Sequence, residues 1–175
     1  MIMTYAELIC AAVLSIGMPN AEYACKHMDT VVQYSEKYNI DPTMLTALIY
    51  VESRWNPKAE SKQGACGLTQ VIPKWSKKFG YVSCRQLKKN PEMAIRKGAQ
   101  ILHHWIYKYG RGDISLGLCG YNSGYRCRGK NRKNNKRGVR YAKLVLKMYR
   151  ELELEMTPGC MNRSRWYTIW LHHTP

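Results

Sequence analysis

Apolar residues recur at helical spacing in several segments of the chain, and this pattern predicts a mainly α-helical fold. The first such helix follows residue 25, with Asp29 or Thr30 as its expected cap and an end near Asn39. One face carries the residues that should be buried: Val31, Val32, Ser35 and Tyr38.

The second helix has a sharper start. Asp41 can cap its free N–H groups, and Pro42 takes the first helical position, where a missing N–H costs nothing. The helix should end near Ser53, because Asn56-Pro57 prevents its continuation. Its apolar stripe is formed by Leu45, Leu48 and Ile49.

Residues 56–90 mix glycine, proline, lysine and serine with short apolar stretches, so we expect loops and short elements that line a cleft. Asn90-Pro91 then repeats the cap-and-proline signal. It starts the best-patterned helix of the chain, whose apolar residues keep helical spacing as far as Tyr109.

A short helix from Asp113 to Cys119 and a last one from Gly138 to Glu155 complete the helical pattern. The 175 residues suffice for one compact domain and are too few for two ordinary ones. We therefore expect a single domain over residues 25–155, followed by a C-terminal tail over 156–175 that shows no clear period.

The apolar run from Leu8 to Gly17 has the length of a signal-peptide core and is short for a membrane span. The first seven residues contain no lysine or arginine and include Glu7, which a signal peptide would not favour. Residues 1–24 are therefore interpreted either as a signal peptide or as an apolar N-terminal helix packed on the domain.

Seven cysteines are many for a reduced cytosolic chain of this size and indicate a place outside the cytoplasm. None of their spacings forms a zinc pattern, so no metal site is expected. The sequence leaves the connectivity open, but two pairs are local in the chain and Cys10 is then the odd one. The two candidate disulfides are Cys66 with Cys84 and Cys119 with Cys127.

The formal net charge of +16 should draw the protein to a polyanion, whether nucleic acid, an anionic cell wall or an acidic membrane surface. A basic loop between Tyr125 and Gly138 concentrates part of this charge. The loop is either a solvated segment or a device for holding an anionic polymer. Its cations are Arg126, Arg128, Lys130, Arg132, Lys133, Lys136 and Arg137.

Glu52 lies three residues after Ile49 and four after Leu48, which places it on the apolar stripe of the second helix. Burial and the partial negative charge at a helix C-terminus both disfavour an ionised carboxylate, so both should raise the pKa of Glu52. A carboxyl that stays protonated near neutral pH is a general acid. The alternative is that Glu52, one turn from the helix end, bends outward to solvent.

The segment from Ile40 to Pro57 resembles the catalytic helix of the soluble lytic transglycosylase family, which ends in a Glu-Ser pair, here Glu52-Ser53. Gly67-Leu68-Thr69-Gln70 resembles the family's Gly-Leu-Met-Gln turn, and Gly120-Tyr121-Asn122-Ser123-Gly124 its Ala-Tyr-Asn-x-Gly segment. Tyr141 resembles a weaker fourth element, a tyrosine near the glutamate. These motifs occur in the family's order and cover roughly residues 28–152, although each alone is weak.

The resemblance implies a mainly α, lysozyme-like single domain with a segment of loops and short strands lining the cleft. It implies the glycan strand of peptidoglycan as substrate, with no cofactor. Glu52 would protonate the oxygen that links N-acetylmuramic acid to N-acetylglucosamine, and its carboxylate would then accept a proton from the C6 hydroxyl of the sugar. The product would be a 1,6-anhydro-muramyl end.

The same resemblance implies supporting roles for other residues. Hydrogen-bonding side chains would contact the substrate, and two glycines, Gly67 and Gly124, would allow tight turns near it. Thr69 in place of methionine and Gly120 in place of alanine should affect fine substrate preference rather than the chemistry. The expected substrate-binding residues are Ser53, Thr69, Gln70, Tyr121, Asn122 and Tyr141.

Three alternatives accompany this hypothesis. A goose-type lysozyme would hydrolyse the same bond with a second carboxylate, for which Glu60 and Asp113 are candidates, although a loop charge and a helix cap explain them more simply. A basic nucleic-acid-binding protein would explain the charge but not the motifs, so no specific nucleic acid is expected. A virion or secretion-apparatus scaffold would not need a buried acid.

Small size and basic charge favour a bacteriophage enzyme, such as an endolysin, that acts in the cell envelope of the bacterial target or within the virion. Muramyl peptides carry carboxylates, so a basic enzyme would gather on the wall, and other anionic wall polymers are possible partners. The sequence carries no information on the oligomeric state.

Overall fold

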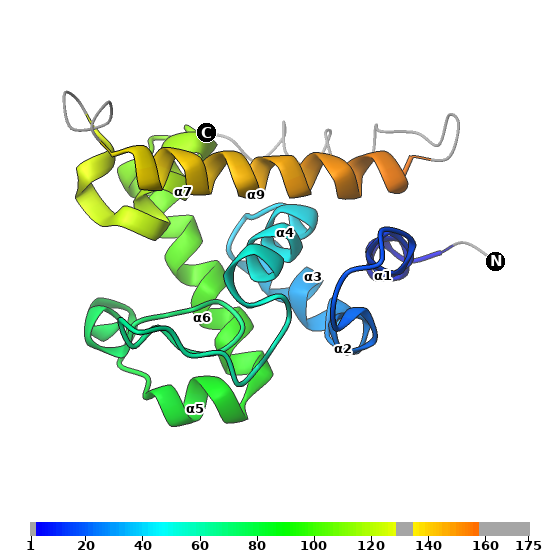
Figure 1. The fold of residues 1–175 in the computed structure, drawn as a ribbon, viewed down its shortest axis with the longest axis horizontal. Coiled ribbons are helices and arrows are strands. Elements are labelled where there is room, and N and C mark those ends of the chain that lie inside the picture. The colour runs from blue at the N-terminus through cyan, green and yellow to red at the C-terminus, as the bar shows by residue number, and fades with distance from the viewer. Residues whose placement is uncertain (1–2, 129–134, 158–175) are drawn as a thin grey trace.

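The computed structural model describes residues 3–128 and 135–157, and helices form nearly all of their regular structure (Figure 1). Short 3₁₀ helices lie between α4 and α5 and after α7, and one π-helical segment, η3, continues α6. In chain order the elements are α1 (Tyr5–Ser15), α2 (Ala21–Cys25), α3 (Met28–Lys37), α4 (Pro42–Ser53), η1 (Pro73–Trp75), η2 (Lys77–Phe79), α5 (Cys84–Lys89), α6 (Pro91–His103), η3 (His104–Tyr109), α7 (Ile114–Ser123), η4 (Gly124–Cys127) and α9 (Lys136–Glu155).

Helix α4 is the centre of the molecule. Asp41 caps it by accepting the N–H groups of Thr43 and Met44, and Pro42 follows at the first position, as the sequence predicted. Every residue from Pro42 to Ile49 is buried, so the expected apolar stripe is in fact a helix buried on all sides. The reason is that α3 and the long α9 both pack against it.

Helix α9 lies across one side of the molecule and contacts α1, α4 and α7 along its length (Figure 1). It begins at Lys136, two residues before the predicted start, because the Asn135 side chain caps it by accepting the N–H of Gly138. Since α9 spans from α7 to α1, it sets the spacing between the two ends of the fold.

The predicted start of α3 was wrong. The helix begins at Met28 with His27 at the cap position, and neither Asp29 nor Thr30 caps it. Its early start follows from α2, which ends only three residues earlier, so the chain turns directly from one helix into the next.

The N-terminal apolar run forms α1, whose Ile9 and Val13 are fully buried in the common core. The Tyr5 hydroxyl lies 2.9 Å from the Thr43 hydroxyl, which ties α1 to the start of α4. Removal of residues 1–24 as a signal peptide stays a prediction. No helix in the described part of the chain is long and apolar enough to cross a membrane.

The expectation that Cys10 is the odd cysteine was wrong, because Cys10 is bonded to Cys25. Helices α1 and α2 fold back on each other and bring the two Cα atoms within 4.9 Å, a contact that the spacing in the chain does not reveal. The two predicted disulfides, Cys66–Cys84 and Cys119–Cys127, are confirmed. The seventh cysteine, Cys160, lies outside the described residues.

Residues 56–83 form loops with the short elements η1 and η2, as predicted, and lie to one side of α6 (Figure 1). In place of short strands there are two isolated β-bridges, which pair Cys66 with Glu60 and with Val71. Helix α6 starts at Pro91 under the Asn90 cap, and with η3 it keeps its helical course to Tyr109, as predicted.

Candidate active site

Glu52 lies in the last turn of α4 with its side chain half-buried. The Tyr141 hydroxyl, from α9, donates a hydrogen bond to Glu52 Oε1 at 2.6 Å. Because α4 ends here in a left-handed residue, Arg54, the chain turns away and leaves the carboxyl at the end of the helix. The structure thus brings together Glu52 and Tyr141, which are 89 residues apart in the chain.

Burial raises the pKa of Glu52 to about 7, while the hydrogen bond from Tyr141 and the positive charge of Arg137 act in the opposite direction. Desolvation is the largest of these effects. At neutral pH a large share of Glu52 is therefore protonated and able to donate a proton. Burial and the nearby Glu52 charge also keep the pKa values of Tyr121 and Tyr141 well above the usual range, so both hydroxyls stay protonated.

The Gly67 turn packs closely against α5, and its place near a bound substrate remains a prediction. Gly67 has a φ of 72°, and a side chain there would meet the Leu87 carbonyl oxygen at 2.6 Å. Gln70, also left-handed at φ 48°, donates from Nε2 to the carbonyl oxygens of Ala59 and Gly67. Its side-chain amide therefore braces the turn, and substrate contact by Gln70 remains a prediction.

The expectation that the Thr69 side chain binds substrate was wrong. Thr69 is fully buried, and its hydroxyl donates to the Ala94 carbonyl oxygen at 2.8 Å. Its side chain packs where Gly98 of α6 has no Cβ. Threonine fits between the turn and α6 because its side chain is compact and its hydroxyl can donate a hydrogen bond to a carbonyl oxygen of that helix.

Tyr121 connects the two motif segments. Its hydroxyl donates to the Thr69 carbonyl oxygen at 2.8 Å, so the start of the tyrosine segment is tied to the Gly67 turn. Asn122 follows and accepts a hydrogen bond from the Ser123 hydroxyl at 3.0 Å. Gly124 ends α7 at a φ of 66°, a conformation that favours glycine, and its place next to a bound ligand remains a prediction.

Asn122 and Tyr141 line a pocket of about 380 Å³ at the junction of α7 and α9. The other lining residues are Lys136, Arg137, Arg140 and Leu144, all exposed and all from α9. Sequence reasoning missed Arg140 and treated Lys136 and Arg137 as part of a loop. The signal that would have found them is helical spacing from Lys136 to Tyr141, which puts Arg137 one turn before Tyr141.

Ser53 does not contact Glu52. Its hydroxyl donates to the Ile49 carbonyl oxygen at 3.2 Å, the common arrangement of a serine near the end of a helix. A substrate contact by Ser53 therefore also remains a prediction.

The two acids considered for a lysozyme-like scheme have other roles. Asp113 caps α7 by accepting the Leu116 N–H, as the sequence predicted. Glu60 is exposed and pairs with Lys88 at 2.6 Å.

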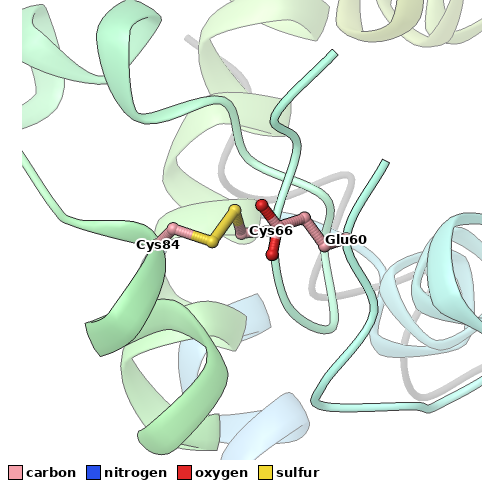
Figure 2. A group of neighbouring side chains, drawn as sticks. All are labelled: Glu60, Cys66 and Cys84. Atoms are coloured by element: carbon pink, nitrogen blue, oxygen red, sulfur yellow. A yellow bond between two sulfur atoms is a disulfide. The ribbon is translucent and has the colours of Figure 1, made fainter. Parts of the chain in front are cut away.

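Glu60 also lies beside Cys66 and Cys84, the one grouping of potential metal ligands found in residues 3–128 and 135–157. Figure 2 shows that the two sulfur atoms are bonded to each other, with the Glu60 carboxyl alongside. A disulfide provides no thiolate for a metal ion, so this grouping is a crosslink next to a surface ion pair.

Of the basic loop, Arg126, Arg128, Lys136 and Arg137 are described, and Arg128 lies over the ring of Tyr109 at 4.5 Å. Lys130, Arg132 and Lys133 lie outside the described residues. The Cys119–Cys127 disulfide joins the residues on either side of the Tyr121 segment, and the Asn135 amide donates to Cys127 Sγ. The start of α9, which carries Arg137 and Tyr141, is thus anchored on that disulfide.

Similarity to known proteins agrees with this geometry. The transglycosylase of Enterobacteria phage PRD1 is 31% identical over 101 residues, which cover 58% of this chain and 36% of the phage protein. An endo-type membrane-bound lytic murein transglycosylase A from Klebsiella pneumoniae is 37% identical over 95 residues, 47% of this chain and 46% of that protein. The chain spans less than half the length of these relatives.

Among solved structures, the 70-kDa soluble lytic transglycosylase of Escherichia coli superposes with a TM-score of 0.64 at 26% identity. The match covers 87% of this chain and 29% of that enzyme. The family model for the transglycosylase SLT domain matches residues 29–143, a range that contains Glu52, the Gly67 turn, the Tyr121 segment and Tyr141. The chain belongs to the transglycosylase SLT domain family.

Proposed function

We propose that this chain is a peptidoglycan lytic transglycosylase in which Glu52 is the single acid and base. The observation that carries the proposal is the half-buried Glu52 carboxyl, whose pKa is about 7 and which accepts the Tyr141 hydroxyl at 2.6 Å. A carboxyl with a pKa near the working pH can donate a proton and take one back with similar ease. The lytic transglycosylases to which the chain is similar support peptidoglycan as the substrate.

In the first step, the Glu52 carboxyl donates its proton to the oxygen between N-acetylmuramic acid and N-acetylglucosamine as the C1–O bond breaks. The resulting carboxylate accepts hydrogen bonds more strongly than the acid, so Tyr141 stabilises this state. Arg137 stabilises the same negative charge. These two groups therefore assist the step without donating a proton themselves.

In the second step, the C6 hydroxyl oxygen of the muramic acid attacks C1, and the Glu52 carboxylate accepts the hydroxyl proton. The proton count closes, because Glu52 ends as it began and no water is consumed. The products are an N-acetylglucosamine end and a 1,6-anhydro-muramyl end. Asn122 lies in the pocket beside Tyr141 and is proposed to contact the acetamido group or hydroxyls of the sugar.

The setting is proposed to be the cell envelope of a bacterial target. Three disulfides among the described residues support an oxidising place outside the cytoplasm. The phage transglycosylase among the relatives supports a bacteriophage setting, either in lysis or within a virion.

The test is mass spectrometry of the fragments released from purified peptidoglycan by the wild type, Glu52→Gln and Glu60→Gln. Anhydro-muramyl ends from the wild type and Glu60→Gln, with none from Glu52→Gln, are expected. Reducing ends in place of anhydro ends would reassign the chain as a lysozyme-like hydrolase, and loss of that product in Glu60→Gln would identify the second carboxylate. If the oxidised wild type releases no fragments, the proposal is refuted and a scaffold or a nucleic-acid-binding role takes its place.

A further inference from the structure

A second basic pocket lies between the loop that follows α4 and helix α5, away from α9. Its volume is about 550 Å³, within the range of small-ligand sites. It shares no lining residue with the pocket beside Tyr141, and Figure 1 shows α5 and α9 on opposite sides of the molecule. This α5 pocket is lined by Lys58, Glu60, Cys84, Arg85, Lys88 and Lys89.

We propose that the α5 pocket binds the phosphate groups of a phosphodiester polymer of the bacterial envelope and so gives the protein a second hold on the wall. The inference goes beyond the proposed function, because no residue of this pocket takes part in cleavage. Since the two pockets share no residue, a polymer bound at α5 leaves the site at Glu52 open to a glycan strand.

Most of the positive charge of the α5 pocket is uncompensated. Four of its six lining residues are cations, and Glu60 pairs with one of them, Lys88, at 2.6 Å. Within residues 3–128 and 135–157, no carboxylate forms an ion pair with any of the other three. Four cations and one acid leave a formal net charge of +3. Such a field favours a ligand that carries several negative charges.

Helix energetics do not explain this gathering of cations. Lys88 and Lys89 lie in the last turn of α5, where the helix dipole favours positive charge. Arg85, however, lies in the first turn, where positive charge is unfavourable, and it repels Lys89 four residues later on the same face. An anion bound between these two side chains would replace repulsion with attraction.

The chemistry of the lining favours phosphate over other anions. Three of the four cations are lysines, whose point charges suit a tetrahedral phosphate, whereas a planar carboxylate is matched best by arginine. No aromatic ring lines the α5 pocket, so the bases of a nucleic acid would find no surface for stacking. A chain of phosphodiesters without bases, such as a polymer of glycerol phosphate, meets both conditions.

The Cys66–Cys84 disulfide fixes the two walls of the α5 pocket relative to each other. It bonds the loop to the first residue of α5, and the Glu60 carboxyl lies beside it (Figure 2). Cys66 also pairs with Glu60 in a β-bridge, which ties the strand-like part of the loop to the same crosslink. A pocket with fixed walls loses little conformational entropy when a ligand binds.

The first experiment is a calorimetric titration with a synthetic hexamer of glycerol phosphate. The double substitution Arg85→Gln with Lys89→Gln should lower the affinity of the protein for this hexamer about tenfold. Lys143→Gln with Arg150→Gln is the matched control, because it removes one exposed lysine and one exposed arginine from α9. The control should change the affinity by less than about twofold.

A third variant should have the opposite effect. Glu60→Gln removes the carboxylate that pairs with Lys88, so the affinity for the hexamer should rise about threefold. Loss of folding cannot produce such a gain. An affinity that stays the same or falls in this variant would contradict a phosphate bound beside Lys88.

The other contrary outcomes are distinct. Equal losses in the two double variants would overturn the α5 pocket and leave only general attraction by the net charge of +16. Tighter binding of a glutamate hexamer or of a single-stranded DNA hexamer, lost in Arg85→Gln with Lys89→Gln, would overturn the phosphodiester ligand and assign the pocket to carboxylates or to nucleic acid.

The second experiment locates the bound hexamer. A hexamer with a nitroxide label at one end is added to isotope-labelled wild-type protein, and the weakening of backbone amide signals is measured by NMR. Signals from α5 and from residues 58–60 should weaken more than those from residues 136–144 of α9. Strongest weakening in α9 would overturn the α5 pocket and place the polymer beside Tyr141 instead.

Discussion

Helix α4 carries a carboxyl at each end, and the two carboxyls have similar surroundings but different hydrogen bonds. Asp41 precedes the first turn and Glu52 lies in the last, and each accepts a hydrogen bond from a tyrosine of α9. Tyr149 donates to Asp41 at 3.2 Å and Tyr141 donates to Glu52 at 2.6 Å. Burial raises the pKa of both carboxyls.

The difference lies in the backbone. Asp41 also accepts the N–H groups of Thr43 and Met44, which favour its charged form and partly offset burial. Glu52 lies where the helix presents carbonyl oxygens, which offer no hydrogen bond to a carboxylate. The same helix therefore carries a structural cap at one end and the proposed proton donor at the other.

The largest expected effect is on activity. Glu52→Gln keeps the shape of the side chain but removes the proton, so strand cleavage should fall about 10³-fold. Asp41→Asn should keep its activity, because Asp41 caps α4 at the end opposite to Glu52. Release of muropeptides at matched concentrations of folded protein measures both. Comparable losses in the two variants would show that the two carboxyls are not functionally distinct.

The second largest expected effect is on stability, and here the Glu52→Gln substitution should be favourable, whereas it lowers activity. The folded-state pKa of Glu52, about 7, exceeds the usual value of 4.5, so folding favours the protonated form. The free energy of unfolding should fall as the pH rises from about 4.5 to 7, with a total loss of about 3 kcal/mol. Glu52→Gln should escape this loss and exceed the wild type in stability at pH 8 but not at pH 4. Urea unfolding of the wild type and of Glu52→Gln at the two pH values measures this difference. Equal free energies of unfolding at pH 8 would contradict a raised pKa of a buried Glu52.

Asp41→Ala, at the other end of α4, should destabilise the protein. It removes the cap of α4 and leaves the Tyr149 hydroxyl without its acceptor, so the free energy of unfolding should fall by about 2 kcal/mol. Urea unfolding at pH 7 measures this change. Asp41→Ser, which restores a capping oxygen, should recover most of the loss, and failure to do so would mean that packing rather than capping stabilises this end.

Much of this contrast was predictable from the sequence. Asp41-Pro42 is a local signal for the start of a helix, and α4 does begin at Pro42 with Asp41 as its cap. Helical spacing alone left Glu52 either buried or bent outward to solvent, and the family resemblance favoured burial. Its partner Tyr141 also followed only from that resemblance, since no local pattern joins residues so far apart.

The departures from the family pattern needed the structure. Gly120, in place of alanine, was expected to affect substrate preference. A Cβ there would lie 2.5 Å from the Trp105 ring, so glycine accommodates an indole from η3. Similarly, Thr69 fits against Gly98 of α6. Gly120 and Thr69 each contact a residue of another segment. A single sequence does not show which residues of different segments pack against each other.

The two tyrosines provide a smaller, matched test. Tyr141→Phe removes the hydrogen bond that stabilises the Glu52 carboxylate, so kcat should fall about tenfold. Tyr149→Phe removes the equivalent bond to Asp41 and should leave kcat unchanged while lowering the free energy of unfolding by about 1 kcal/mol. Steady-state rates on intact strands and urea unfolding separate the two. Equal rates in both variants would assign Tyr141 a purely structural role.

The smallest expected effect concerns the cation beside Glu52 and has no counterpart at Asp41. The proposed reaction needs the protonated Glu52 carboxyl, so activity should decline above a pH of about 7. Arg137 lowers the pKa of Glu52, and Arg137→Gln should therefore move this decline to higher pH. Because Arg137 is exposed, added salt should move the wild-type profile in the same direction and leave the variant's profile in place. A pH–rate profile for kcat/KM at two salt concentrations measures this, with Arg150→Gln as the control. A shift to lower pH in Arg137→Gln would mean that the arginine acts on the substrate rather than on the acid.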